Sequence, residues 1–476
     1  MVKTILFFLC IAIACLCFSC KEHKTIDWVV STPDHSWISQ ESQQIKILKE
    51  GFISAEVNLT NTEQTIDGFG ACFNELGWTS LSVLPEKDRE DILKELFYPG
   101  QGTNFTICRM PVGANDFSRN WYSYNETEGD FEMKNFSIAN DFETLIPFIR
   151  LAKKYNPSLT LWASPWSPPA WMKYNKHYAC NMSGNENFPN GLLPSQRGRE
   201  GTNMFIQDKK YFEAYALYFA KFIEAYKNEG IYISMVMPQN EFNSCQIFPS
   251  CTWTASGINT FVGEHLGPQM EKTGTDVMFG TMERANTLLV DTLLQDEKSS
   301  KYIKGIGFQW AGKDAVGKIH KDYPLLKIYQ TEQECGDGKN NWDYCCYAWE
   351  LMKHYLSNGA NVYCYWNISL EEGGVSRWGW SQNSLITVDV QAKAYTYNYE
   401  YYLMKHFSHY VLPGAQRLSV TGEFNDLLAF RNVDGSLVLV IHNRNNNEVF
   451  PNIKIGEDIY SLTLKPQSFH TLVIGK

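Results

Sequence analysis

The sequence predicts an α/β fold, a (β/α)8 barrel, joined to an all-β sandwich that uses both ends of the chain. Eight short apolar runs, each ending in polar or aromatic residues, recur along the middle of the chain, at 64–73, 105–113, 159–166, 233–241, 276–283, 303–310, 327–334 and 361–369. Amphipathic segments lie between them, and two of these, 208–230 and 342–360, close at a glycine as helices often do. Eight strands alternating with helices are typical of a parallel barrel. A doubly wound sheet is the alternative, but no Gly-rich phosphate loop follows the first strand.

The two ends of the chain carry a different pattern. After about residue 395, short alternating segments are separated by tight polar turns, as in LLAFRNVDG, SLVLVIHNRN, NIKIG and QSFHTLVIG, which predicts an antiparallel β-domain. Residues 43–62 also alternate, and we expect them to pair with this tail. The predicted domains are therefore a signal peptide (1–20), N-terminal sandwich strands (21–63), the catalytic barrel (64–395) and the remaining sandwich (396–476).

The N-terminus, MVKTILFFLCIAIACLCFSCKEH, is typical of an export signal. Lys3 precedes an apolar run over 5–18 that is shorter than the ~20 residues of a membrane-spanning helix. The run ends in Ser19-Cys20, which resembles a bacterial lipoprotein cleavage site with Cys20 as the lipidated residue. Lys21-Glu22 resembles the export tag of Bacteroidetes surface lipoproteins. The prediction is an outer-membrane lipoprotein that is held in the membrane through the lipid on Cys20, with the cell surface as one expected location. An ordinary secretory signal is the alternative.

Charge and cysteine usage exclude some functions. The net charge of −10 makes nucleic acid an improbable partner. The histidines are scattered without an H-E-x-x-H motif, so we expect no metal site, and no cofactor motif is present. Of the 13 cysteines, Cys245 and Cys251 flank a predicted loop, and an exported protein could oxidise them to a disulfide.

In a (β/α)8 barrel the catalytic groups lie at the carboxyl ends of the strands. The carboxylates at those positions are Asp116, Glu241, Glu283 and one of Glu332 and Glu334, and the aromatic residues are Trp166, Trp310 and Trp366. Paired carboxylates between tryptophan walls suit the cleavage of glycosidic bonds. Each tryptophan alone is equally well explained by core packing. The 14% aromatic content favours a carbohydrate-active protein but does not establish one.

Seven stretches, in the right order, resemble glycoside hydrolase family 30: IDGFGACFNELGW (66–78), CRMPVGANDFS (108–118), WASPWSPPAWMK (162–173), MPQNEF (237–242), YQTEQECG (329–336), YWNISLEEGG (365–374) and YLMKHFSHYVLPGAQRL (402–418). The resemblance implies a (β/α)8 barrel with a β-sandwich from both chain ends, which agrees with the periodicity. It also implies retaining hydrolysis by two glutamates.

The resemblance assigns the two glutamates by motif. The acid/base follows an asparagine at strand four, here Asn240-Glu241, and the nucleophile follows a threonine at strand seven, here Thr331-Glu332. Glu332 is also the first carboxylate beyond the apolar strand residues, whereas Glu334 stands ~6.6 Å further out at strand rise. One departure keeps Glu334 open: the family pattern has a cysteine two positions after the nucleophile, whereas Cys335 follows Glu332 by three.

Further residues match the family's substrate-binding positions. Asn240 resembles the residue that binds the sugar 2-hydroxyl, and Arg109 the arginine that keeps the nucleophile ionised. An ion pair within the barrel is the structural alternative for Arg109. Three residues resemble the lining of the sugar subsite: Asp116, Trp166 and Trp366. Gln309-Trp310 stands where the glucosylceramidases have His-Trp, and Ala311 replaces a tyrosine, so we expect a different pocket floor.

The predicted function is retaining, internal hydrolysis of β-1,6-glucan by an endo-β-1,6-glucanase-like enzyme, because the Gln-Trp, Thr-Glu and Glu-Gly-Gly (372–374) pattern resembles the β-1,6-glucanases of the family. The expected partner is a carbohydrate polymer or oligosaccharide. A glucosylceramidase-like exo-β-glucosidase is one alternative. A non-catalytic, glycan-binding surface lipoprotein is another, and the presence of both glutamates counts against it.

Overall fold

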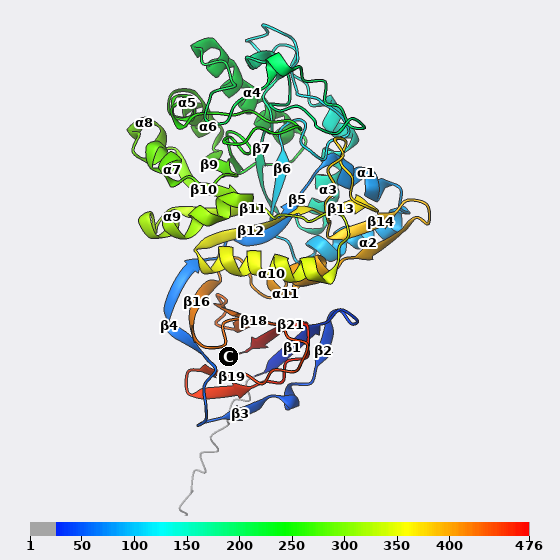
Figure 1. Cartoon of the computed structure of the whole chain (residues 1–476), viewed down its shortest axis with the longest axis vertical. Coiled ribbons are helices and arrows are strands. Elements are labelled where there is room, and N and C mark those ends of the chain that lie inside the picture. The colour runs from blue at the N-terminus through cyan, green and yellow to red at the C-terminus, as the bar shows by residue number, and fades with distance from the viewer. Residues whose placement is uncertain (1–24, 476) are drawn as a thin grey trace, which may run out of the picture.

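A computed structural model describes residues 25–475, and it consists of a closed barrel packed on a β-sandwich (Figure 1). The predicted signal peptide, with Cys20, lies outside the described residues. No helix within the described range is both long enough and apolar enough to cross a membrane.

The barrel closes in the strand order β10-β11-β12-β5-β6-β7-β8-β9, and all neighbouring strands are parallel. Each of the eight predicted apolar runs coincides with one of its strands, with β12 beginning one residue before its run, which confirms the predicted fold class. The strands are β5 (Gly68–Cys72), β6 (Ile107–Pro111), β7 (Thr160–Ser164), β8 (Met235–Val236), β9 (Asp276–Met282), β10 (Ile303–Gln309), β11 (Lys327–Glu332) and β12 (Ala360–Asn367).

The fourth strand is the exception in length. The sequence predicts a run over 233–241, but regular pairing is confined to Met235–Val236. Pro238 has no N–H to give to a sheet ladder, so the chain leaves the barrel wall before Asn240 and Glu241.

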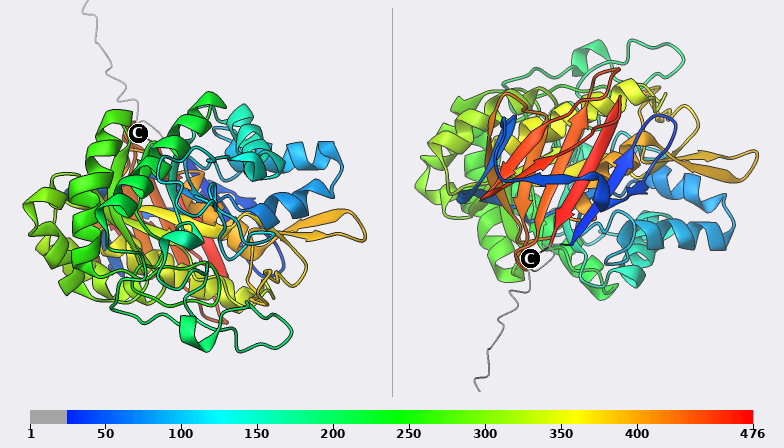
Figure 2. Two further views of the ribbon diagram at one scale, coloured as in Figure 1. Left: turned by 90° about the horizontal axis from the view of Figure 1, so that it is seen from above. Right: turned by 90° about the horizontal axis from the view of Figure 1, so that it is seen from below.

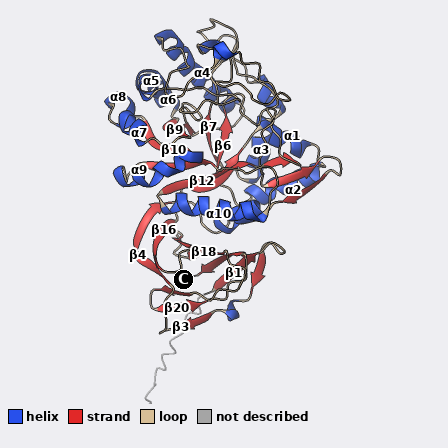
Figure 3. Cartoon of the chain, in the orientation of Figure 1, coloured by secondary structure: helices blue, strands red, loops and turns tan. Residues whose placement is uncertain are grey.

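Helices form the outer layer around the barrel strands (Figure 3). The predicted helical segments 208–230 and 342–360 contain α4 and α10. Each starts at a polar N-cap: Asp208 accepts from the Lys210 N–H, and Asn341 accepts from the Tyr344 N–H. The α-helices are α1 (Glu75–Ser82), α2 (Glu86–Phe97), α3 (Leu145–Tyr155), α4 (Lys209–Asn228), α5 (Ala255–Phe261), α6 (Gly267–Thr273), α7 (Thr287–Leu294), α8 (Glu297–Ser300), α9 (Val316–Asp322), α10 (Trp342–Ser357) and α11 (Tyr399–Ser408). The short helical turns are η1 (Ser42–Gln44), η2 (Ala139–Glu143), η3 (Ala170–Met172), η4 (Pro194–Gln196), η5 (Val262–Leu266) and η6 (Trp310–Ala315).

Both chain ends build the sandwich, as predicted (Figure 2, right). β1 pairs with β21, placing Trp28 opposite Leu472, and β4 joins β16 to β19. The ten-stranded sheet runs β2-β1-β21-β18-β17-β16-β4-β19-β20-β3 and encloses its own apolar core. Its strands are β1 (Ile26–Ser31), β2 (Ile38–Gln40), β3 (Lys46–Leu48), β4 (Ala55–Thr65), β16 (Gln416–Gly422), β17 (Leu427–Arg431), β18 (Leu437–Asn443), β19 (Asn452–Ile455), β20 (Asp458–Ser461) and β21 (Ser468–Ile474).

A small third sheet follows the last barrel strand and was not predicted. It consists of β13 (Ser369–Glu371), β14 (Ile386–Asp389) and β15 (Ala394–Tyr397). The connection from β13 to β14 carries Trp380 and Gln382, which reach the cavity described below. This sheet therefore anchors a loop at the carboxyl end of the barrel.

Candidate active site

A cavity of about 90 Å³ opens at the carboxyl end of the barrel strands. Three carboxylates and two tryptophans among the predicted site residues line it: Asp116, Glu241, Glu332, Trp166 and Trp310. The other four predicted residues bond or stack behind that lining: Arg109, Asn240, Gln309 and Trp366. All nine therefore meet in one place, although they come from different strands.

Glu332, the last residue of β11, is buried and fully hydrogen-bonded. Its Oε2 accepts from Arg109 Nη1 at 2.8 Å and from Gln309 Nε2 at 3.1 Å, and its Oε1 accepts from Trp310 Nε1 at 3.1 Å. The pairing of β10 with β11 shifts register between Phe308 and Gln309, which sets Gln309 directly opposite Glu332. The irregularity therefore aims the amide of Gln309 at the carboxylate.

Glu241 stands across the cavity in a left-handed backbone conformation, with φ of 48°. Such a conformation is uncommon for glutamate and is typically held only where the surroundings fix it. Here the Glu241 N–H donates to Thr281 Oγ1 at 3.0 Å. Its Oε1 accepts from Gln309 Nε2 at 3.0 Å, and its Oε2 accepts from Gln246 Nε2 at 3.0 Å.

The two glutamates have different electrostatic surroundings. Burial, and then the nearby charge of Glu332, raise the pKa of Glu241 well above its ordinary value, and Glu283 adds to this effect. Burial also raises the pKa of Glu332, but the Arg109 guanidinium opposes the rise, with hydrogen bonds from Trp310 and Gln309. Among the described residues, only Glu332 of the two glutamates has a cation bonded directly to it, and that cation is Arg109.

Arg109 on β6 is completely buried and ties the site together. Its Nη2 donates to Asn240 Oδ1 at 2.6 Å and to Ser164 Oγ at 2.9 Å. Its guanidinium carbon lies 4.3 Å from the ring centroid of Trp166, a cation–π contact. The ion pair considered as an alternative is present, but its partner is the site carboxylate Glu332 itself.

Trp166 and Trp366 stack on each other, with ring centroids 5.4 Å apart and planes 25° apart. Trp366 is wholly buried, so core packing and a site role coincide in this residue. Two buried polar atoms nearby have no hydrogen-bond partner: Trp366 Nε1 and Asp116 Oδ1. Unpaired buried polar atoms are costly, and Asp116 lines the cavity, where a hydroxyl-bearing ligand can donate to its Oδ1.

Glu334 is directed away from the cavity. Its Oε1 pairs with Lys313 Nζ at 2.8 Å, and its Oε2 accepts from the Tyr347 hydroxyl at 2.8 Å. Glu334 is not part of the cavity lining. Of the two glutamates in the TEQE segment, only Glu332 is in position to contact a ligand.

Five lining residues were not among the predicted site residues: Gln246, Phe248, Glu283, Trp380 and Gln382. Glu283 directly follows β9 and was named among the strand-end carboxylates, but the resemblance assigned it no role. The other four come from loops after β8 and β13, where no periodic signal places a side chain.

The cysteine pairing suggested by the sequence is not formed in the structure. Cys245 and Cys251 are both free thiols, and Cys245 lies next to Cys180, whose N–H donates to the Gln246 carbonyl at 3.1 Å. Cys251 is fully buried with its Sγ near the Thr252 carbonyl. Within residues 25–475 no group of three or more His, Cys, Asp or Glu side chains could hold a metal ion.

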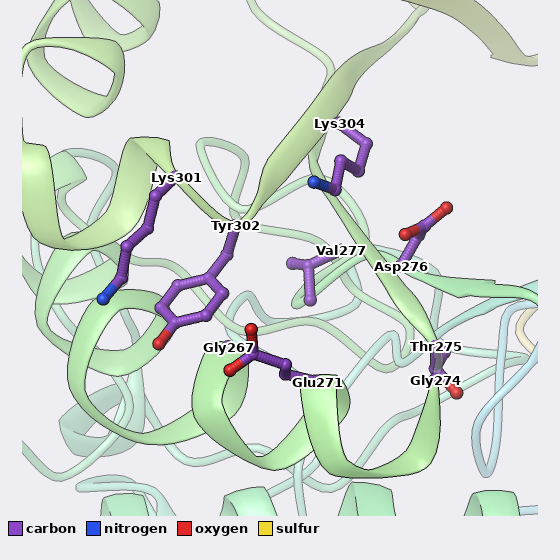
Figure 4. Close-up of a pocket in the computed structure, with 9 residues that line it drawn as sticks. All are labelled: Gly267, Glu271, Gly274, Thr275, Asp276, Val277, Lys301, Tyr302 and Lys304. Atoms are coloured by element: carbon purple, nitrogen blue, oxygen red, sulfur yellow. The ribbon is translucent and has the colours of Figure 1, made fainter.

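A larger cavity, of about 400 Å³, lies at the other end of the barrel. Residues at the start of β9 and β10 line it, among them Asp276, Lys301 and Lys304 (Figure 4). Because barrel active sites lie at the carboxyl ends of the strands, we assign the chemistry to the smaller cavity.

Comparisons with known proteins agree with this geometry. Residues 66–411 match the Glycosyl hydrolase family 30 TIM-barrel domain, and residues 414–472 match the family's beta sandwich domain. A provisionally named glucosylceramidase of Caenorhabditis elegans is 30% identical over 459 residues, covering 89% of this chain and 83% of its own length. An endo-1,6-beta-D-glucanase of Aspergillus fumigatus is 26% identical over 413 residues, covering 82% of this chain and 80% of its own. The solved structure of SrfJ from Salmonella typhimurium superposes with a TM-score of 0.83 at 25% identity, covering 95% of this chain and all of that one. The chain therefore belongs to glycosyl hydrolase family 30 and is a glycoside hydrolase.

Proposed function

We propose that the enzyme cleaves β-1,6-glucan internally with retention of anomeric configuration, using Glu332 as nucleophile and Glu241 as acid/base. One observation carries the mechanism. Gln309 Nε2 donates to Glu241 Oε1 at 3.0 Å and to Glu332 Oε2 at 3.1 Å, so these two oxygens cannot stand more than about 6 Å apart. Retaining enzymes hold their carboxylates about 5–5.5 Å apart, whereas inverting enzymes need about 6.5–9.5 Å to admit a water.

In the first step Glu332 attacks the anomeric carbon while Glu241 protonates the departing glycosidic oxygen. The protonation states follow from the surroundings, because Arg109 pairs with Glu332 and keeps it ionised, whereas Glu241 has no cation bonded to it among the described residues. The bond from carbon to the leaving oxygen breaks as the bond to Glu332 forms. Asn240 gives its Oδ1 to Arg109, which leaves its amide NH2 for the sugar 2-hydroxyl.

In the second step Glu241 acts as a base. Once Glu332 is esterified it carries no charge, so one of the causes that raised the pKa of Glu241 disappears. Glu241, which gave up its proton in the first step, accepts a proton from a water that attacks the same carbon, and Glu332 departs as a carboxylate. Two displacements at one carbon restore the original configuration.

The aglycone side of the cavity favours a sugar over a ceramide. The leaving group must lie beside Glu241, which accepts from Gln246 and feels the charge of Glu283, and Trp380 lines the same cavity. Trp380 is 40% exposed and stands edge-on to Phe248, with centroids 6.4 Å apart, which leaves a ring face for sugar stacking. Glu283 is buried and paired with Arg284, and an alkyl chain against this pair would desolvate it without compensation. Named relatives include both glucosylceramidases and endo-1,6-beta-D-glucanases, so the substrate must be tested directly.

A digestion panel of linear β-1,6-glucan, xylan, β-1,6-galactan and glucosylceramide tests the substrate. We expect reducing ends from β-1,6-glucan, a ladder of oligosaccharides early in the reaction, and a β-anomer as the first product signal in NMR. An initial α-anomer would contradict retention, and glucose alone from the start would contradict internal cleavage. Release from glucosylceramide with none from β-1,6-glucan would overturn the substrate in favour of the glucosylceramidase alternative.

Glu283→Gln should move the alkaline limb of the kcat/KM profile to lower pH. The Glu283 charge raises the pKa of Glu241, so removing the charge lowers that pKa. The first step requires protonated Glu241, and activity is lost as pH rises through its pKa. The matched control is Glu200→Gln. Glu200 also pairs with Arg284, but its side chain is 46% exposed and does not line the cavity. An unchanged or alkaline-shifted limb in Glu283→Gln, with Glu200→Gln at the wild-type position, would contradict this role.

We also propose that the chain is anchored in the outer membrane through a lipid on Cys20. The support is the Ser19-Cys20 ending of the apolar N-terminal run. Cys20→Ala should move the protein from the membrane fraction to the soluble fraction, while Cys17→Ala, a cysteine in the same segment, should leave it in the membrane. If both variants fractionate alike, the lipid anchor on Cys20 is contradicted, and the N-terminus acts as an ordinary secretory signal.

A further inference from the structure

Two cysteines far apart in the sequence meet beside the acid/base. Cys180 lies beside the residue that follows Cys245 in the chain, and each of the two thiols influences the ionisation of the other. Their backbones run together as well, because the N–H groups of Cys180 and Asn181 both donate to the Gln246 carbonyl, at 3.1 and 2.8 Å. Ala179 and Pro249 form a β-bridge one step further along. The contact is therefore held by main-chain bonds on both sides and does not depend on side-chain rotamers alone.

The environment of Cys180 favours its thiolate. Lys173 is completely buried, and its Nζ donates to the Ser250 carbonyl at 2.6 Å. The Cys180 thiol donates to the same carbonyl oxygen at 3.2 Å, so the ammonium group is close to the sulfur. The contact with the Cys245 thiol, followed by the Lys173 charge, lowers the pKa of Cys180 against the effect of its burial.

Cys245 directly precedes a residue that touches the acid/base. Gln246 donates to Glu241 Oε2 at 3.0 Å and to Ser244 Oγ at 2.7 Å, and Phe248 of the same loop lines the cavity. A covalent bond at Cys245 would therefore restrict the loop whose Gln246 side chain donates to one oxygen of Glu241.

We propose that Cys180 and Cys245 form a disulfide that fastens the loop carrying Gln246 to the 174–207 loop. The oxidant is a small-molecule or protein disulfide of the thiol-exchange class. Cys245, the more exposed of the two, first exchanges with that disulfide and releases one thiol. The Cys180 thiolate then attacks Cys245 Sγ and expels the second thiol. The two cysteines lose two electrons and two protons, and the oxidant gains both.

The test uses the full chain, reduced, freed of reductant and incubated under native conditions with oxidised glutathione. Alkylation and denaturation follow, then intact mass and peptide mapping. We expect two fewer alkyl groups than on the reduced protein treated in the same way, and a cross-linked peptide pair joining Cys180 to Cys245. Cys180→Ser and Cys245→Ser should each abolish the cross-link, whereas Cys251→Ser and Cys346→Ser should retain it. A cross-link from Cys245 to Cys251, a stable glutathione adduct, or two alkylated thiols at Cys180 and Cys245 would overturn the site.

The clamping effect has its own readouts. Oxidation should slow amide hydrogen exchange over 243–250 and raise the melting temperature by roughly 3 °C, and neither change should occur in Cys245→Ser. A cross-link that forms without slowing exchange there would contradict the clamp. None of these measurements uses activity, so they stand or fall independently of the proposed substrate and mechanism.

Discussion

Glu332→Gln should lower kcat by on the order of 10⁴-fold or more, because the amide keeps the volume of the side chain but cannot form the glycosyl ester. Glu332 is the carboxylate that lines the cavity and pairs with Arg109 at 2.8 Å. The loss should appear equally in kcat and kcat/KM if the interaction is made only in the transition state. Initial rates on β-1,6-glucan and on an aryl β-glucoside measure it.

Glu334→Gln is the matched control, two residues away in the same segment. It removes an ion pair with Lys313 and weakens a bond from the Tyr347 hydroxyl, which should cost about 1 kcal/mol of stability and leave most of the activity. A dead Glu334→Gln beside an active Glu332→Gln would reverse the assignment.

Misfolding must be separated from lost chemistry in Glu332→Gln, because the substitution leaves the buried Arg109 without its counter-charge. Far-UV circular dichroism and the melting temperature report the fold. A mechanism-based 2-fluoro-glycoside gives a second, independent answer on the wild-type protein, since it stops the reaction at the ester. Peptide mapping should find the label on Glu332, and a label on Glu334 would contradict the assignment whatever the variants do.

The sequence predicted the barrel well because its strands are buried on both faces and therefore read as short apolar runs at regular intervals. Strand-end position singled out the carboxylates and tryptophans of the candidate site, because the carboxyl ends of parallel strands converge. Arg109, Asn240 and Gln309 came only from the resemblance to the family. The alternation of side chains along a strand could not separate Glu332 from Glu334, because residues two positions apart face the same side. What separates them is tertiary: Lys313 and Tyr347 approach from η6 and α10 and engage Glu334.

The residues that were missed lie in loops. Trp380 and Phe248 meet across the cavity from segments more than a hundred positions apart, and nothing in either segment indicates the other.

The same holds for the cysteines. Spacing pairs Cys245 with its near neighbour Cys251, whereas the fold brings Cys180 to it through the backbone contacts around Gln246. Loop-to-loop contacts of this kind depend on the barrel that holds both loops, so no local pattern records them.

Glu241→Ala should lower kcat/KM on β-1,6-glucan by about 10²- to 10⁴-fold but spare the first step on an aryl β-glucoside with a good leaving group. A poor alkoxide leaving group needs the proton of Glu241, whereas an activated phenolate does not, so the loss should shrink as leaving-group acidity rises. The second step then lacks its base, and a burst of phenol followed by a slow phase should appear.

Azide distinguishes the two glutamates by stereochemistry, because a small anion can enter the space left by either side chain and needs no base. In Glu241→Ala the glycosyl ester on Glu332 still forms, so azide attacks it from the opposite face and the product is the β-glucosyl azide. In Glu332→Ala no ester forms, and azide entering from the nucleophile's side gives the α-glucosyl azide. The Gln309 amide keeps one carboxylate partner in either variant, so the remaining carboxylate stays oriented. NMR of the azide adducts reads both outcomes, and an α-azide from Glu241→Ala would show that the roles of Glu241 and Glu332 are exchanged.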